Sequence, residues 1–238
     1  MHRLKTFSFL FAIALAGAGP ANGTVFSQTF PIGPDVNGVS ADRDSAFSAD
    51  DFVLSSDTTI TGVNWRGIYF DTGGSASTPQ ALDAFGIAFY SDSAGTVGPL
   101  IQAFDLGNAV NRTDTGDTTV GVPLLAYQAD LGSGLNLSAG TYWLAIFNDT
   151  LVDTDDNWFW TMIAEGGNAR LTGNFGAGAP DFSAGQGGSP FRTFFELTAD
   201  TNGSGRTPVP EPGALAMIAG GLLALRAMRN RARPRLAA

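Results

Sequence analysis

The segment Thr141-Tyr-Trp-Leu-Ala-Ile-Phe147 decides the fold class, because it is apolar on both faces of an extended chain. Successive side chains of a strand point to opposite faces of a sheet, so this segment belongs in the centre of a sheet that is covered on both sides. The segment Phe85-Gly-Ile-Ala-Phe-Tyr90 places Phe85, Ile87 and Phe89 on one face, as a half-buried strand does. Together they predict a β-sheet protein with extensive buried faces.

Similar short segments recur along the chain with Gly, Asn, Asp and Ser between them, and none shows a sustained helical period. The expected strands are Val25–Phe30, Phe47–Leu54, Thr59–Tyr69, Phe85–Ser91, Leu100–Leu106, Val122–Leu131, Thr141–Phe147, Trp158–Ile163, Ala169–Thr172 and Phe191–Thr198. The polar, glycine-rich stretches 71–80, 92–98, 107–119 and 173–189 are expected to be loops. This pattern predicts an all-β fold, an antiparallel β-sandwich or jelly roll that forms a single domain over residues 24–200.

Composition excludes several kinds of chemistry. The 238 residues contain no cysteine, and the single histidine and single lysine are His2 and Lys5, in a segment that we expect to be removed. Disulfides, Ser-His-Asp triads, histidine-bound zinc and Schiff bases are therefore excluded from the remaining chain. Residues 24–207 carry 21 acidic side chains against six arginines, a net charge of −15, which disfavours nucleic acid as a partner.

Residues 1–23 have the organisation of a signal peptide. Arg3 and Lys5 precede an apolar run of 11 residues, Thr6–Ala16, which is followed by small residues up to Ala21. Such a run is ~16 Å long as a helix, well short of a ~30 Å bilayer core. We expect export through the Sec translocon and cleavage by signal peptidase after Ala18 or Ala21.

The C-terminal 38 residues have an equally ordered arrangement. A polar linker over residues 201–212 ends in Pro210-Glu211-Pro212, and residues 213–238 form a hydrophobic segment with an arginine-rich tail. The expected short hydrophobic helix contains Leu215, Ile218, Leu222, Leu223 and Leu225, and the basic stop contains Arg226, Arg229 and Arg231, with Arg233 and Arg235 beyond them. Positive residues beside a hydrophobic segment stay cytoplasmic, so the body of the protein is expected on the other side of the membrane.

This order of motif, apolar run and arginine cluster resembles the PEP-CTERM sorting signal of Gram-negative bacteria. The resemblance implies that an exosortase recognises Pro210, Glu211 and Pro212 and processes the chain. It also implies a transient hold in the inner membrane, delivery to the cell envelope or the extracellular space, and association with extracellular polysaccharide or biofilm matrix. A GPI signal is the competing interpretation, but the terminal arginines argue against it.

Two candidate binding sites follow from side-chain type. Asp149, Asp153, Asp155, Asp156 and Asn157 concentrate the oxygen ligands that Ca²⁺ prefers, although the EF-hand spacing fails and a solvated turn is the alternative. Trp158, Trp160 and Tyr69 offer flat surfaces to sugar rings, with core packing as the alternative.

Glycoside hydrolysis requires two carboxylates across a cleft, and Glu165 and Glu196 are the candidates, but neither lies in a recognisable motif. We therefore expect a non-enzymatic structural component of the matrix, without a cofactor unless calcium binds. The alternatives are a carbohydrate-binding module and a glycan hydrolase.

Overall fold

The computed structural model describes residues 22–33, 36–43, 45–71, 83–151, 156–164, 166–176 and 178–200. The chain divides into two units, Met1–Thr201 and Asn202–Ala238, and every described residue belongs to the first. Except for Asn22 and Gly23, the expected signal peptide lies outside the described residues, as do the linker, the Pro-Glu-Pro motif and the tail. Within the described residues, no helix is long and apolar enough to span a membrane.

The described residues form β-strands and no helix. The strands are β1 (Asn22–Gln28), β2 (Val36–Ser40), β3 (Phe47–Leu54), β4 (Thr58–Asp71), β5 (Phe85–Asp92), β6 (Val97–Gly107), β7 (Asn111–Thr119), β8 (Val122–Leu137), β9 (Gly140–Asn148), β10 (Asp156–Ile163), β11 (Arg170–Thr172), β12 (Phe175–Gly176), β13 (Ala179–Pro180), β14 (Gly187–Gly188), β15 (Arg192–Thr193) and β16 (Phe195–Asp200).

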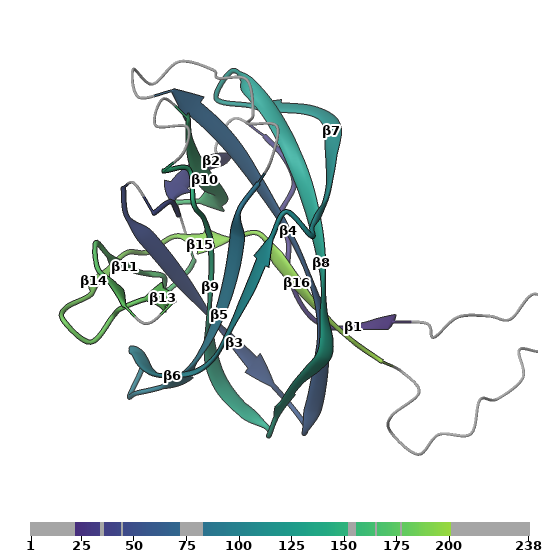
Figure 1. Cartoon of the computed structure of the whole chain (residues 1–238), viewed down its shortest axis with the longest axis vertical. Helices are drawn as coiled ribbons and strands as arrows, with labels where there is room; N and C mark the ends of the chain where they lie inside the picture. The colour runs from purple at the N-terminus through teal and green to yellow at the C-terminus, as the bar shows by residue number, and fades with distance from the viewer. Residues whose placement is uncertain are drawn as a thin grey trace, which may run out of the picture. The chain divides into compact units, whose positions relative to one another are not determined.

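Two sheets contain nearly all of these strands (Figure 1). The first sheet has eight strands, with β4 at its centre. Three strands pair with β4, namely β8, β16 and β10. The sheet is extended by β1, which pairs with β16, by β7, which pairs with β8, and by β2 and β15, which pair with β10. The second sheet has the order β14-β11-β3-β9-β5-β6. Every pairing between these strands is antiparallel, which confirms the predicted all-β antiparallel fold.

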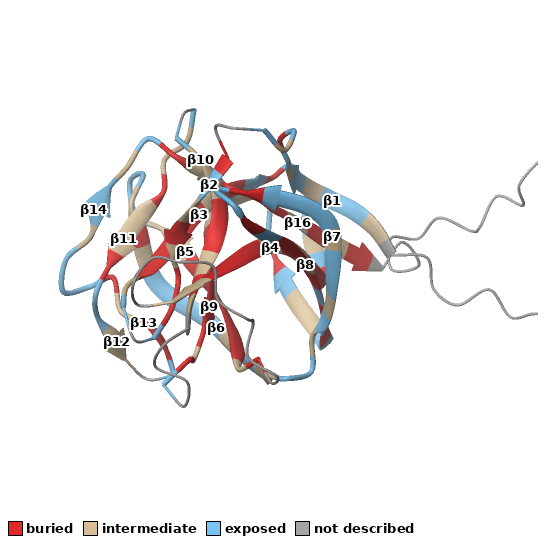
Figure 2. Ribbon diagram, turned by 90° about the horizontal axis from the view of Figure 1, so that it is seen from above, coloured by how far each residue is buried: buried red, intermediate tan, exposed pale blue. Residues whose placement is uncertain are grey.

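The main core lies between the two sheets, so the molecule is a β-sandwich (Figure 2). Alternate residues supply it, with Trp65 of β4, Trp158 of β10 and Phe195 of β16 from the first sheet and Phe89 of β5 and Leu144 of β9 from the second. Aromatic rings meet edge to face across this space, which adds a directional component to the hydrophobic packing.

One glycine in the middle of β4 has a packing role. A methyl group at Gly67 would overlap the indole ring of Trp158, which lies directly against the β4 backbone. The close approach of Trp158 to β4 therefore requires glycine at this position.

The central segment quoted above behaves as predicted. β9 lies between β3 and β5, with Leu144 and Ile146 in the main core and Trp143 and Phe147 in a second cluster on the opposite face. Phe175, Ala179 and Phe182 cover that second face. The glycine-rich stretch 173–189, predicted as a loop, thus contains the short strands β12, β13 and β14 and supplies a partial third layer.

Two other strands were not predicted. Residues 107–119 were expected to be a loop, but Asn111–Thr119 is β7, which pairs with β8 at the edge of the first sheet. Most of its side chains are exposed on both faces, so it lacks the apolar alternation by which strands are recognised. The five-residue β2 was missed for the related reason that its sequence VNGVS is short and half polar.

The two ends of the sandwich lie together. β1 and β16 are adjacent antiparallel strands, and Asn22 is paired with Asp200 (Figure 1). The first and last described residues therefore lie side by side at one end of the first sheet.

Candidate functional site

The three aromatic residues predicted to contact glycans are in the core. Trp158 and Trp160 are 0% exposed and Tyr69 is 2% exposed. Trp158 and Trp160 share one face of β10, and this face is the one that packs against the second sheet. Their ring faces are covered by protein, so the prediction that they bind sugar is wrong, and the core-packing alternative is correct.

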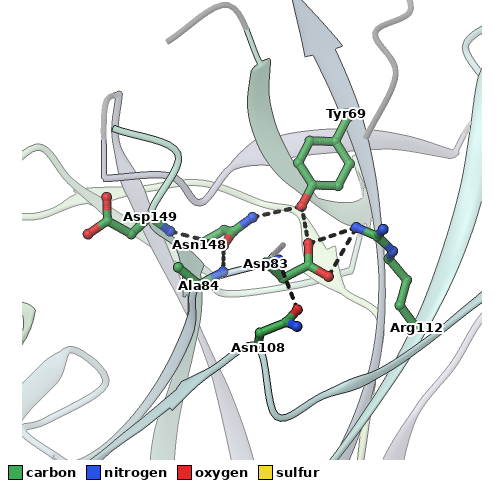
Figure 3. A network of polar contacts seen from close by, with 7 residues as sticks. All are labelled: Tyr69, Asp83, Ala84, Asn108, Arg112, Asn148 and Asp149. Carbon is green, nitrogen blue, oxygen red and sulfur yellow. Dashed lines mark hydrogen bonds and ion pairs between the residues drawn. The ribbon is translucent and has the colours of Figure 1, made fainter. Parts of the chain in front are cut away.

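Tyr69 has a polar role inside the sandwich (Figure 3). Its hydroxyl donates to Asp83 at 2.5 Å and accepts from the Nδ2 of Asn148 at 2.7 Å, while Arg112 reaches both carboxylate oxygens of Asp83 at 3.0 and 3.1 Å. Asn148 also accepts from the backbone of Ala84. Burial raises the pKa of Asp83 against the lowering effect of Tyr69 and Arg112. This network joins β4 and β7 to the end of β9.

A second buried carboxylate joins the sheets elsewhere. Asp50 of β3 is 1% exposed and accepts hydrogen bonds from the backbone and side chain of Thr193 and from Gln28. Its neighbour Asp51 is half-buried on the opposite face, as strand geometry predicted. Asp42 is likewise buried and accepts from Thr150 and from the backbone of Trp158.

The proposed calcium ligands are only partly described. Asp149 forms an ion pair with Arg43 at 2.6 Å, and Asn157 lies on β10 of the other sheet. Asp153 and Asp155 lie outside the described residues, and the side chain of Asp156 is not described. In the described part of the chain, no three acidic or histidine side chains gather in a metal-binding arrangement. Calcium binding remains a prediction, which a melting temperature measured in Ca²⁺ and then in EDTA tests.

A row of polar side chains crosses the outer face of the first sheet. Glu196 of β16 is paired with Asn64 of β4, Asn64 with Gln128 of β8, and Gln128 with Asn111 of β7. We call these four residues the polar row. Their chain neighbours in β4, β8 and β16 are core residues such as Trp65, so strand alternation turns the row outward.

The polar row lines a shallow hollow of about 300 Å³. A parallel row beside it consists of Arg66 of β4, Ala126 of β8 and Thr113 of β7, which are paired across three of the four strands. Because the side chain of Ala126 is smaller than those of Arg66 and Thr113 on either side of it, the surface is hollowed at this position. Arg66 lies over the ring of Phe194, 4.3 Å from its centroid, and Phe194 also lines the hollow.

The polar groups of this hollow are available for a ligand. Among the described residues, the side-chain amides of Asn64, Gln128 and Asn111 have no hydrogen-bond partner, and neither ion pair there involves Arg66. Glu196 has only Ser27, whose hydroxyl donates to it at 3.1 Å. The hollow therefore presents unused donors and acceptors at positions fixed by strand pairing.

A larger hollow of about 420 Å³ is a weaker candidate. Arg43, Asp149 and Asp105 line it, together with Phe147 and Phe175. Arg43 is already bonded to Asp149 and lies over the ring of Phe175 at 4.7 Å. The strongest polar group of this hollow is thus engaged by the protein itself.

The hydrolase candidates are not brought together in the described structure. Glu196 lies in the hollow of the polar row, and no second carboxylate of the described residues lines that hollow. Glu165 lies outside the described residues. Comparison with protein-family models, curated proteins and solved structures gives no match.

Sequence reasoning did not find the polar row. Its signal is present, because Asn64, Gln128 and Glu196 each stand between two apolar residues of a strand. Only the strand order and register show that these positions are neighbours, since they are more than 60 residues apart in the chain.

Proposed function

We propose that the protein is an exported, non-enzymatic β-sandwich that an exosortase sorts and that becomes a structural component associated with extracellular polysaccharide. In this proposal the Sec translocon and signal peptidase act at residues 1–23. The C-terminal segment then holds the protein in the inner membrane until the chain is processed at Pro210, Glu211 and Pro212. The observation that carries the proposal is the order of motif, apolar run and arginine cluster after residue 207.

The fold supports this proposal in two ways. Asn22 is paired with Asp200, so the residues to which the expected signal peptide and tail are joined are neighbours at the edge of the first sheet, which is consistent with attachment at one end of the domain. The hollow of the polar row also supports a role in contact with polysaccharide, because carboxamide, carboxylate and guanidinium groups are suited to bonding hydroxyl groups.

Replacement of Glu211 tests the sorting step. Glu211 is the one charged residue between Arg206 and Arg226, and the prolines on both sides disfavour a helix or a strand ladder, which suits recognition by a processing enzyme. In a Gram-negative host that contains an exosortase, Glu211→Ala should leave export intact, while the full-length chain accumulates in the inner membrane. Mass spectrometry of the wild-type released protein should place its C-terminus near Pro212.

Thr207→Ala is the matched control, because it changes the same linker outside the motif and should leave processing unchanged. Released protein that still carries Arg226 to Arg235 would refute the mechanism. Equal processing of Glu211→Ala and wild type would refute the role of the motif.

A carbohydrate-binding module is the second candidate, and the hollow of the polar row favours it over a purely structural role. A hydrolase receives less support, because the hollow presents a single carboxylate among the described residues, whereas glycoside hydrolysis uses a pair.

A further inference from the structure

We propose that the polar row is a binding site for a neutral polysaccharide chain that lies across the strands of the first sheet. This inference rests on the proposed association with polysaccharide and adds the site, the direction of the chain and its charge class. The polar row takes the place of Trp158 and Trp160 as the proposed binding site, because these two side chains are buried in the core.

The spacing of the row fits a linear polymer. Neighbouring strands lie ~4.8 Å apart, so the three intervals from Glu196 to Asn111 span ~14 Å, and Ser27 on β1 extends the row by one further strand. A sugar ring in an extended chain advances by a similar length, so successive sugars meet successive strands. The parallel row with Arg66, Ala126 and Thr113 gives the chain a second line of contacts.

The chemistry of the row fits hydroxyl groups. Each carboxamide has both donors and acceptors, and a hydroxyl also donates and accepts, so each can satisfy the other in either direction. The amides of Asn64, Gln128 and Asn111 have no competing partner among the described residues. An apolar peptide would leave these groups unsatisfied, which disfavours it as the occupant.

Charge selects a neutral polymer over an acidic one. Arg66 and Glu196 give the hollow no net charge, while residues 24–207 carry a net charge of −15. An acidic polysaccharide would be repelled by the surrounding surface. Among the described residues that line the hollow, the aromatic side chains of Trp65, Tyr127 and Phe194 are all buried, and Phe194 lies under Arg66. Individual contacts should therefore be weak, with a dissociation constant on the order of 1 mM for a short oligosaccharide.

Affinity electrophoresis of the full chain tests the proposal. The protein is kept in a polyoxyethylene detergent, which lacks sugar groups, and run through native gels that contain hydroxyethylcellulose as the neutral probe or alginate as the acidic one. Hydroxyethylcellulose should retard the wild type. The double variant Asn64→Ala, Gln128→Ala should bind about tenfold more weakly, because two hydrogen-bonding groups at the centre of the row are removed.

Gln102→Ala is the matched control, because Gln102 is an exposed amide on β6 of the other sheet. It should be retarded like wild type, and thermal unfolding should show that all variants are folded. Equal retardation of the double variant and wild type, no retardation of wild type, or stronger retardation by alginate would each overturn the proposal.

Sedimentation with the matrix of a producing culture separates this proposal from the proposed function. If both wild type and double variant sediment with the matrix, the association stands and the polar row is not its site. If neither does, the proposed function fails. If the wild type sediments with the matrix and the double variant does not, the result supports both the proposed function and the polar row as the binding site.

Discussion

The buried carboxylate of Asp50 makes the stability of the folded protein depend on pH. Its carboxylate is desolvated between the sheets, and burial raises its pKa from 3.8 to about 6, although hydrogen bonds from Thr193 and Gln28 oppose this. A raised pKa means that the folded state holds the proton more tightly than the unfolded state. The contribution of Asp50 to stability is therefore least favourable above about pH 6 and improves as the pH falls from 6 toward 3.8.

Asp50→Asn should remove this contribution. Between about pH 8 and about pH 4, the free energy of unfolding of wild type should rise relative to that of the variant by roughly 2–3 kcal/mol. Urea unfolding of both proteins across this range measures the difference. Asp117→Asn, at an exposed position on β7, is the control and should follow wild type. Parallel curves for wild type and Asp50→Asn would contradict the raised pKa.

At the residue scale, side-chain type alone did not separate binding residues from core residues. Trp158 and Tyr69 have the chemistry of sugar-binding residues, but both side chains lie on the strand face that packs between the sheets. Asn64 and Gln128 were overlooked because an isolated amide in a strand is usually just a solvated side chain. Their importance comes from their neighbours on other strands, and this register is not contained in any local segment.

At the element scale, three strands with strong apolar patterns were predicted almost to the residue. β3 begins and ends where expected, and β5 and β9 differ from prediction by at most one residue at each end. Other bounds were less accurate, because β8 continues to Leu137 instead of Leu131, and the expected strand Phe191–Thr198 is divided into β15 and β16. The elements that were missed altogether bury little. The edge strand β7 is mostly polar, and β12 to β14 are two residues long, so neither leaves a periodic signal.

The segment that contains β13 nevertheless has a packing role, which Phe182→Ala should reveal. Phe182 is 3% exposed and packs edge to face against Tyr90, with centroids 5.5 Å apart. Its truncation should lower the free energy of unfolding by about 3 kcal/mol, because the outer face of the second sheet loses its cover. Leu151→Ala, at a side chain 46% exposed, should cost less than about 0.5 kcal/mol. Denaturant titration compares them, and equally small losses would mean that the segment contributes no packing.

At the scale of the whole molecule, the two faces of the sandwich differ in what covers them. The outer face of the second sheet packs against Phe175, Ala179 and Phe182. The outer face of the first sheet buries a small cluster of Ile68, Val122 and Leu124, whereas the amides of the polar row on this face are unpaired among the described residues. The first sheet also holds both ends of the domain in β1 and β16. The polar row includes Glu196 of β16, so it shares a strand with the C-terminal end of the domain. A ligand on this face contacts side chains and leaves the backbone pairing of β1 with β16 intact.

Circular permutation tests this arrangement of the ends. Asn22 and Asp200 are paired on adjacent strands, so a short Gly/Ser linker can join them as a hairpin loop. New ends can be opened between Val120 and Gly121, an exposed β7–β8 turn in which both residues have positive φ, 46° and 86°. The permuted 22–200 domain should unfold cooperatively with a melting temperature within about 5 °C of the unpermuted domain, because no strand pairing is lost.

Opening the same joined chain between Ala145 and Ile146 should abolish folding, because β9 is central in the second sheet. If the permutant opened at Val120 also did not fold, the two ends of the domain would not lie together. The inference that both ends of the chain join one end of the sandwich would then be refuted.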